Sequence, residues 1–145
     1  MYDGELYLEL HRGTLTAKQQ IKKNNRMAEN LLRMLELCLT RSAVATHTPA
    51  DGTALRPLWN TLLVNQFHDI LPGSCIAAAN DRSLHDMAEM LHTGSELLRS
   101  WFAPAQNCYT VLNPLDEPCR DVFYLPQIAS GMSASASSAV HCTMQ

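Results

Sequence analysis

The sequence predicts a mainly α-helical fold: an antiparallel three-helix bundle with short strand segments at either end. Apolar residues recur at helical spacing in three long stretches within residues 16–104, and turn-forming residues separate these stretches. Each stretch has one apolar stripe, which is stable only when neighbouring helices cover it. At 145 residues, the chain is long enough to form one such core.

The composition narrows the range of partners. The net charge is −3, the pI is near 6.0 and no basic face is evident, so we expect no nucleic-acid partner. The longest uncharged runs are too short or too polar to span a bilayer, and no signal peptide opens the chain, so we expect no membrane association. The five cysteines are odd in number and form no C-x-x-C pair, which favours reduced thiols and a cytoplasmic location.

The N-terminal residues combine a short strand with a group of charged side chains. Residues 6–10 alternate Leu with Tyr and Glu, which is typical of a strand. Glu9, His11 and Arg12 lie in or directly after it. Charged groups that follow a strand are a common place for chemistry, so they indicate the edge of an active site. A solvated strand end has the same composition, and that interpretation stays open.

The first helix is expected over residues 16–40, with Thr14 or Thr16 as its N-cap. Residues on its other faces are expected to face solvent: Lys22, Lys23, Arg26 and Arg33. Its apolar stripe consists of Ala17, Ile21, Asn24, Ala28, Leu31, Leu35 and Cys38.

A loop and a second helix follow. Residues 41–53 contain Pro and Gly and indicate the loop, and Pro57 is tolerated in the first turn of the second helix. We expect this helix to extend into a turn at 67–71. The face expected to pack consists of Leu55, Trp59, Leu62, Leu63, Gln66 and Ile70.

The third helix is expected over residues 75–102, with Pro104 ending it. His85, Asp86 and His92 fall off its apolar seam and are interpreted as surface residues. The seam repeats every seven residues, as in helical bundles. It consists of Ile76, Asn80, Leu84, Met87, Leu91, Gly94, Leu98 and Trp101.

The pattern changes after the third helix. Residues 109–114 and 121–126 are typical of strands, and residues 127–145 have no core-forming pattern and are expected to be disordered.

The most informative stretch is QFHDILPGS at residues 66–74. It places His68 and Asp69 in the last turn of the second helix, with Pro72 and Gly73 ending that helix and Ser74 capping the next. A carboxylate there faces the negative end of the helix dipole, at a cost of up to ~1 kcal/mol, so Asp69 is a poor choice for stability alone. His68 is expected to project off the back of the helix while Asp69 flanks its buried seam. A lone His on a helix is more often a surface or core residue than a ligand.

Three stretches resemble, in order and spacing, the cytosolic and bacterial alpha-mannosidases of glycoside hydrolase family 38. They are GELYLELHRGT at 4–14, LWN through NQFHDILPGS at 58–74, and VLNPL at 111–115. The family has a zinc-bearing α/β catalytic barrel, a three-helix middle domain and C-terminal β-sandwich domains. The resemblance therefore implies that the chain comprises the end of the catalytic domain (1–15), the middle domain (16–104) and the start of the β-sandwich domain (105–126). The tail (127–145) departs from the family.

The resemblance also assigns roles. In the family, the His of the His-Asp pair is a zinc ligand and the following Asp contacts the sugar; carried over, these are His68 and Asp69. A neutral imidazole binds zinc well, and a carboxylate accepts hydrogen bonds from hydroxyls. Glu9 is implied as the acid/base candidate, and His11 and Arg12 are implied as substrate contacts.

The nucleophilic Asp of the family and its other zinc ligands precede the matched stretches. One His and one Asp cannot complete a four-ligand zinc site, so the zinc site within this chain is incomplete. The implied function is therefore part of a zinc-dependent retaining alpha-mannosidase that hydrolyses terminal alpha-mannosides, inactive on its own. The implied partners are the rest of the enzyme chain and a mannoside or oligosaccharide substrate.

Two alternatives stay open. The chain could be a helical structural or interaction module without a site of its own. A remote alternative is the phospho-accepting His hairpin of sensor kinases, in which a helical His also precedes an acidic residue and a Pro. Here Pro72 follows His68 by four residues rather than five, and no Gly-rich ATP-binding motif follows.

Overall fold

The computed structural model describes residues 3–4, 11–102, 113, 115 and 117–118. The expected strands at 6–10 and 121–126 and the expected disordered tail lie outside these residues, as does the expected strand at 109–114 apart from Asn113. The chain divides after Leu98 into two compact units, and nearly all of the described residues belong to the first.

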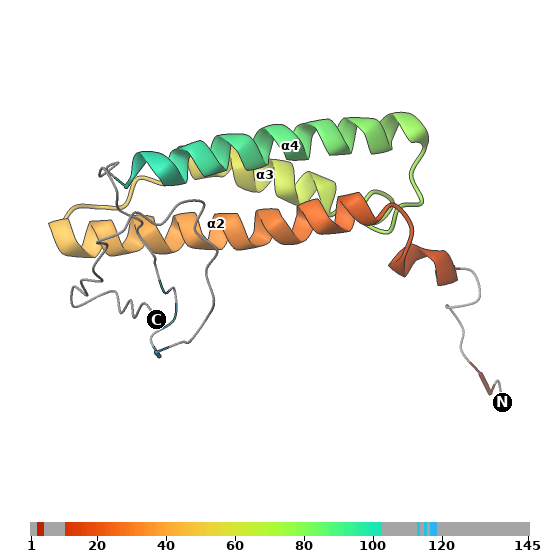
Figure 1. Ribbon diagram of the computed structural model, residues 1–145, viewed down its shortest axis with the longest axis horizontal. Coiled ribbons are helices and arrows are strands. Elements are labelled where there is room, and N and C mark those ends of the chain that lie inside the picture. The colour runs from red at the N-terminus through yellow and green to blue at the C-terminus, as the bar shows by residue number, and fades with distance from the viewer. Residues whose placement is uncertain (1–2, 5–10, 103–112, 114, 116, 119–145) are drawn as a thin grey trace, which may run out of the picture. The chain divides into compact units, whose positions relative to one another are not determined.

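The described residues contain four helical elements: the 3₁₀ helix η1 (Arg12–Leu15) and the α-helices α2 (Gln19–Thr46), α3 (Leu55–Asn65) and α4 (Ala77–Ser100). The three α-helices lie side by side, each antiparallel to the one before it (Figure 1). No strand occurs among the described residues. The predicted fold class, a mainly helical three-helix domain, is confirmed. None of the helices in the described ranges is both long and apolar enough to cross a membrane.

The bounds of α2 differ from the prediction at both ends. Thr14 and Thr16 donate to the carbonyls of His11 and Gly13 rather than capping α2. The helix begins after Lys18, whose φ of 46° places it in the left-handed region. The predicted end at residue 40 was wrong, because residues 41–46 include no Gly or Pro and continue the helix to Thr46. His47, with a φ of 54°, forms the C-cap.

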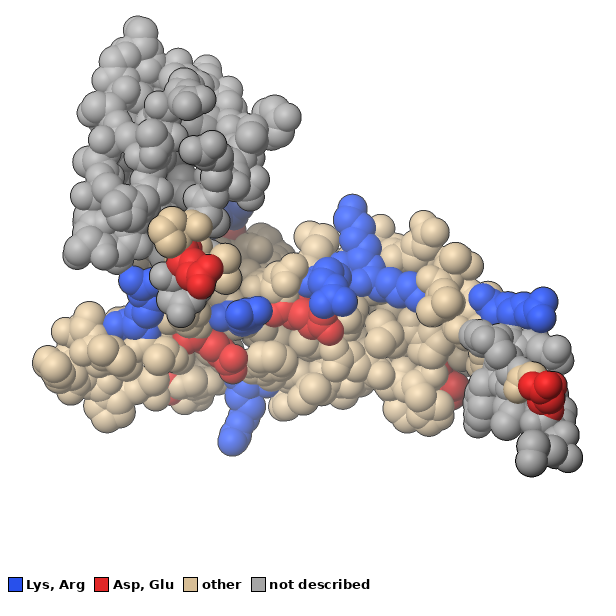
Figure 2. Space-filling model, turned by 90° about the horizontal axis from the view of Figure 1, so that it is seen from below, with Lys and Arg blue, Asp and Glu red and all other residues tan. Residues whose placement is uncertain are grey.

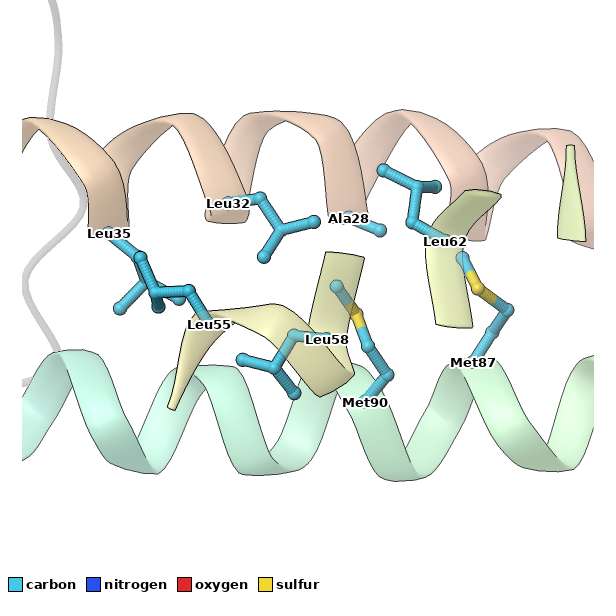
Figure 3. Close-up of a cluster of buried hydrophobic side chains, with 8 residues drawn as sticks. All are labelled: Ala28, Leu32, Leu35, Leu55, Leu58, Leu62, Met87 and Met90. Atoms are coloured by element: carbon cyan, nitrogen blue, oxygen red, sulfur yellow. The ribbon is translucent and has the colours of Figure 1, made fainter. Parts of the chain in front are cut away.

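The core lies between all three α-helices (Figure 3). Met87 and Met90 point from α4 towards α2, among leucines of α3 (Figure 3). The buried cluster consists of Ala28, Leu32 and Leu35 of α2, Leu55, Leu58 and Leu62 of α3, and Met87 and Met90 of α4.

The predicted stripes agree with this core in part. On α2, Ile21, Ala28 and Leu35 are buried as expected. On α3, Leu55 and Leu62 are buried as expected, but Leu58 completes the buried face in place of Leu63, which is 57% exposed. On α4, the seam centre is buried, whereas Ile76 is 75% and Trp101 38% exposed. Both residues lie just outside α4, so the helix buries the centre of the predicted seam and not its ends.

Gly94 permits the close approach of α4 and α2. A Cβ added there would lie 2.8 Å from Leu31 Cδ2 and 3.6 Å from Leu35 Cδ1. A glycine in a helix interior costs up to ~1 kcal/mol relative to Ala, and here it makes room for the leucines of α2.

The α2–α3 connection, residues 47–54, is exposed throughout. Asp51 accepts hydrogen bonds from the backbone N–H and the hydroxyl of Thr53 just before α3 begins. These bonds stabilise the carboxylate and lower the pKa of Asp51.

Candidate functional site

The His68–Asp69 pair lies in a turn and not in a helix. Helix α3 ends at Asn65, and residues 66–73 form consecutive turns. The N–H of Gln66 is shared between the carbonyls of Leu62 and Leu63, and the N–H of Phe67 bonds to Val64, which tightens the end of the helix. The prediction that Pro72 and Gly73 end the helix was therefore wrong.

The two side chains of the pair are accessible. His68 Nε2 lies 3.8 Å from Asp69 Oδ2, and the side chains are 79% and 57% exposed. The predicted position of Asp69 beside a buried seam is therefore wrong. The Phe67 ring lies with its centroid 4.1 Å from that of His68, at an interplanar angle of 44°. An exposed His–Asp contact of this length contributes little to stability, so folding does not account for the pair.

Backbone hydrogen bonds within the turn fix its shape. The N–H groups of Ile70 and Leu71 donate to the Phe67 carbonyl at 2.9 and 3.1 Å, and Gly73 donates to Ile70 at 2.9 Å. Ser74, which was predicted to cap the next helix, instead has its hydroxyl 3.4 Å from the Asp69 carbonyl and 3.5 Å from Asp69 Oδ1. Helix α4 begins three residues later, at Ala77.

Behind the pair, the turn rests on the N-terminal end of α2. Gly73 has a φ of +85°, and a Cβ on it would lie 3.2 Å from the Ala17 carbonyl oxygen and 3.2 Å from Lys18 Cβ. Lys18 Nζ donates to the Cys75 carbonyl at 2.7 Å. Lys22, predicted to face solvent, is half-buried and donates to the backbone carbonyls of Ala17, Leu71 and Pro72.

Gln66, which precedes the pair in the sequence, is held by the carboxylate of Glu29 on α2. Gln66 Nε2 donates to Glu29 Oε1 at 3.0 Å, and Asn25 Nδ2 donates to the same oxygen at 2.9 Å. Arg26 Nη1 lies 2.8 Å from Glu29 Oε2. Sequence reasoning missed Glu29 and Lys22, because their partners lie 37 to 50 residues away and no local pattern indicates them.

The predicted N-terminal site residues are described in part. His11 and Arg12 are exposed and lie at the start of η1, and Glu9 lies outside the described residues. Because η1 leads directly to Ala17 and Lys18, which contact Gly73, it reaches the same end of the bundle as the turn (Figure 1). The predicted substrate contacts of His11 and Arg12 stay predictions.

A second group of potential metal ligands lies on α4. Ligand atoms of His85, Asp86 and Glu89 all lie within 4.8 Å of one another. His85 Nε2 is 3.8 Å from Glu89 Oε2, and the i, i+4 spacing of these two residues is the signal that could have found the group. However, Arg82 Nε donates to both carboxylate oxygens of Asp86, at 2.8 and 2.9 Å, so the charge of this carboxylate is already paired with a guanidinium group.

A pocket of about 540 Å³ lies between the C-terminal half of α2 and the start of α3. Trp59 Nε1 donates to Glu36 Oε1 across it at 2.9 Å. The pocket is at the opposite end of α3 from the His68–Asp69 turn. Near it, burial raises the pKa of the Cys38 thiol despite the opposing effect of the Arg41 guanidinium, so this thiol is a poor nucleophile.

Charged side chains do not gather into one patch on the face shown in Figure 2. Lys and Arg side chains lie along this face with Asp and Glu side chains between them (Figure 2). The pattern is that of an ordinary solvated surface with both signs of charge.

Comparison with known proteins places this arrangement in a family. Residues 9–103 match the family model described as the alpha mannosidase middle domain. The chain is 36% identical over 134 residues to alpha-mannosidase 2C1 of Mus musculus and 37% identical over 134 residues to that of Homo sapiens. Each alignment covers 86% of this chain and 13% of the relative.

A yeast relative matches a shorter stretch. The chain is 42% identical over 77 residues to the alpha-mannosidase of Saccharomyces cerevisiae, which covers 52% of this chain and 7% of the relative. No solved structure matches the chain.

The chain thus spans only 13% of the length of its mouse and human relatives. The family match nevertheless includes all three α-helices and the His68–Asp69 turn. The chain belongs to the alpha-mannosidase middle domain family.

Proposed function

We propose that this chain is part of a zinc-dependent retaining alpha-mannosidase that hydrolyses terminal alpha-mannosides, and that His68 is one of the zinc ligands. The observation that carries the proposal is the exposed His68–Asp69 pair, held on a turn whose backbone is anchored to α2. Membership of the alpha-mannosidase middle domain family supports it. A cytoplasmic location is part of the same proposal.

The donor set of the turn fits zinc as one part of a larger site. The His68 imidazole is 79% exposed and is a standard zinc ligand. Within the described ranges, the one group of three convergent potential ligands is on α4 and does not include His68. We propose that the remaining ligands come from elsewhere in the longer enzyme. Zinc, when bound, would supply a Lewis acid that holds sugar hydroxyls.

The other proposed site residues of this chain then each have a defined role. Asp69 accepts hydrogen bonds from sugar hydroxyls beside the metal, and its ionised carboxylate binds them more strongly than a neutral acceptor does. Retaining hydrolysis also needs a nucleophile and an acid/base ~5 Å apart. We propose Glu9 as the acid/base and His11 and Arg12 as substrate contacts. The nucleophile belongs to the longer chain.

Exposed apolar side chains near the turn are consistent with a further domain that covers this end of the bundle. Val64 is 65%, Phe67 51% and Ile76 75% exposed. The turn position of His68 also weakens the sensor-kinase alternative, because that class presents its His on a helix.

The proposal is tested with His68→Ala in the longer alpha-mannosidase chain. We expect the zinc content to fall well below one per molecule and turnover of an aryl alpha-mannoside to fall at least ~100-fold, because one ligand is lost. His92→Ala, an exposed His on α4, is the matched control and leaves both unchanged. Full zinc content and activity in His68→Ala would refute the role of His68.

A further inference from the structure

We propose that Lys22 and Glu29 of α2 are positioning residues that hold the His68–Asp69 turn at both of its ends. The inference rests on the proposed function, since it gives the pair a role that requires fixed geometry. Both residues act through the backbone or a neighbour of the pair, and neither is proposed to touch substrate or metal.

Lys22 holds the end that follows the pair. Its ammonium group lies 2.7 Å from the Ala17 carbonyl oxygen, 3.1 Å from that of Leu71 and 3.3 Å from that of Pro72. Ala17 precedes α2, and Leu71 and Pro72 belong to the turn, so one side chain joins the two segments. Charge-assisted hydrogen bonds of this kind are about twice as strong as neutral ones. Lys22 therefore fixes the position of the peptide groups that follow Leu71 and Pro72.

Glu29 holds the end that precedes the pair. Its Oε1 accepts from Gln66 Nε2, and Asn25 and Arg26 bond the same carboxylate and hold it in place. Gln66 lies two residues before His68. Because Asn25 and Arg26 belong to the same helix as Glu29, the carboxylate is held in place independently of the turn. It can therefore act as an anchor for the turn.

The spacing of the two anchors matches the turn. Lys22 and Glu29 are seven residues apart on one helix, which places them on the same face and ~10 Å apart along its axis. They contact positions 66 and 71–72, on either side of His68 and Asp69. The pair therefore lies between two fixed points on a single rigid element.

Burial does not explain why the turn is held so firmly. Phe67, His68 and Asp69 are each more than half exposed, so this segment adds little to the core. Exposed residues with a fixed backbone are what a metal ligand and a sugar contact require, because looseness in the supporting residues weakens such a site.

The anchoring is tested first in the 145-residue chain, by amide hydrogen exchange in Lys22→Met. Methionine keeps the apolar stem and removes the donor. We expect the turn amides of Ile70, Leu71 and Gly73 to exchange at least about tenfold faster while core amides of α3 keep their rates. The control is Lys23→Met, which replaces a neighbouring exposed lysine and should leave the exchange rates of both the turn amides and the core amides unchanged. Unchanged exchange at the turn in Lys22→Met overturns the inference.

The positioning role is tested in the longer alpha-mannosidase with zinc affinity as the readout, measured by competition with a chelator. We expect Lys22→Met and Glu29→Gln each to weaken zinc binding about tenfold and to lower kcat, while Lys23→Met does neither. In an Asp69→Asn background, Lys22→Met should cost much less kcat than it does alone, because both changes act on the same turn. Wild-type zinc affinity in both variants, or full additivity with Asp69→Asn, contradicts positioning.

The two tests separate this inference from the proposed function. If His68→Ala keeps its zinc and activity, the proposed function fails and with it the catalytic meaning of the anchors, although the exchange result still tests the anchoring itself. If His68→Ala loses zinc but Lys22→Met and Glu29→Gln do not, the proposed function stands and the positioning role fails.

Discussion

Asp69 has a different environment from the one that its position in the sequence predicts. At a helix C-terminus, its carboxylate would oppose the helix dipole, an effect that falls off within the last turn. Because α3 ends at Asn65, Asp69 lies four residues beyond it, with the Ser74 hydroxyl 3.5 Å from its Oδ1 and His68 Nε2 3.8 Å from its Oδ2. The carboxylate therefore neither stabilises nor destabilises the helix appreciably.

Replacing Asp69 with Asn in the longer alpha-mannosidase should consequently separate function from stability. We expect kcat to fall about 10- to 100-fold through loss of a charged acceptor for sugar hydroxyls, and Tm to stay within about one degree. Turnover and thermal unfolding are measured on the same preparation. A lower Tm with normal turnover per folded molecule would instead assign Asp69 a structural role.

Gly73→Ala should destabilise the chain. The residue has a φ of +85°, which an L-residue adopts at a cost, and the new Cβ would meet Ala17 and Lys18 at 3.2–3.3 Å. We expect a loss of about 1–3 kcal/mol in the free energy of unfolding, measured by urea denaturation. Gly52→Ala is the control, because nothing lies within 4 Å of its added Cβ. Equal stability of the two variants would contradict the close contact of the turn with α2.

At the scale of the helices, α3 supplies the middle of the core although it is the shortest of the three. Leu62 is fully buried between α2 and α4, whereas Val64, two residues later, is 65% exposed. The same helix therefore offers a core position and a surface position of similar chemistry.

We expect Leu62→Ala to lower the free energy of unfolding by about 2–5 kcal/mol, because it leaves a cavity that its neighbours fill only in part. Val64→Ala should change it by less than ~0.5 kcal/mol. Both are measured by urea denaturation with far-UV circular dichroism. A large loss in Val64→Ala would mean that this side chain is covered after all.

The existence and order of the three helices follow from periodicity, and their ends do not. Residues 41–46 contain no Gly or Pro, but they directly precede a segment that does. The sequence pattern therefore assigned them to the loop and placed the end of α2 too early. At the end of α3, the N–H of Gln66 is shared between two carbonyls and its side chain contacts Glu29, and no local pattern indicates either feature. His68 and Asp69 were proposed as site residues from their motif, whereas the contacts of Lys22 and Glu29 with the turn are visible only in the fold.

For the molecule as a whole, the proposed function implies an incomplete zinc ligand set and so leads to a prediction about the isolated 145-residue chain. It should bind zinc only weakly and show no measurable hydrolysis of an aryl alpha-mannoside, because His68 and Asp69 cannot fill four positions around the metal. Titration calorimetry with zinc measures this directly. Tight stoichiometric binding that disappears in His68→Ala would reveal a complete site within the chain.

The antiparallel arrangement has a practical consequence at the end of the bundle opposite the turn. Residues 47–54 are exposed and join α2 to α3 far from the two anchors. Lengthening a flexible loop is inexpensive, at ~0.6 kcal/mol for each doubling, and exposed loop tips are where insertions succeed. The Gly52 carbonyl accepts hydrogen bonds from the N–H groups of Leu55 and Arg56 at the start of α3, so an insertion belongs before it. A fluorescent or affinity label inserted between Pro49 and Ala50 should therefore leave the core and the His68–Asp69 turn intact, which makes this connection the natural attachment point for engineering the protein.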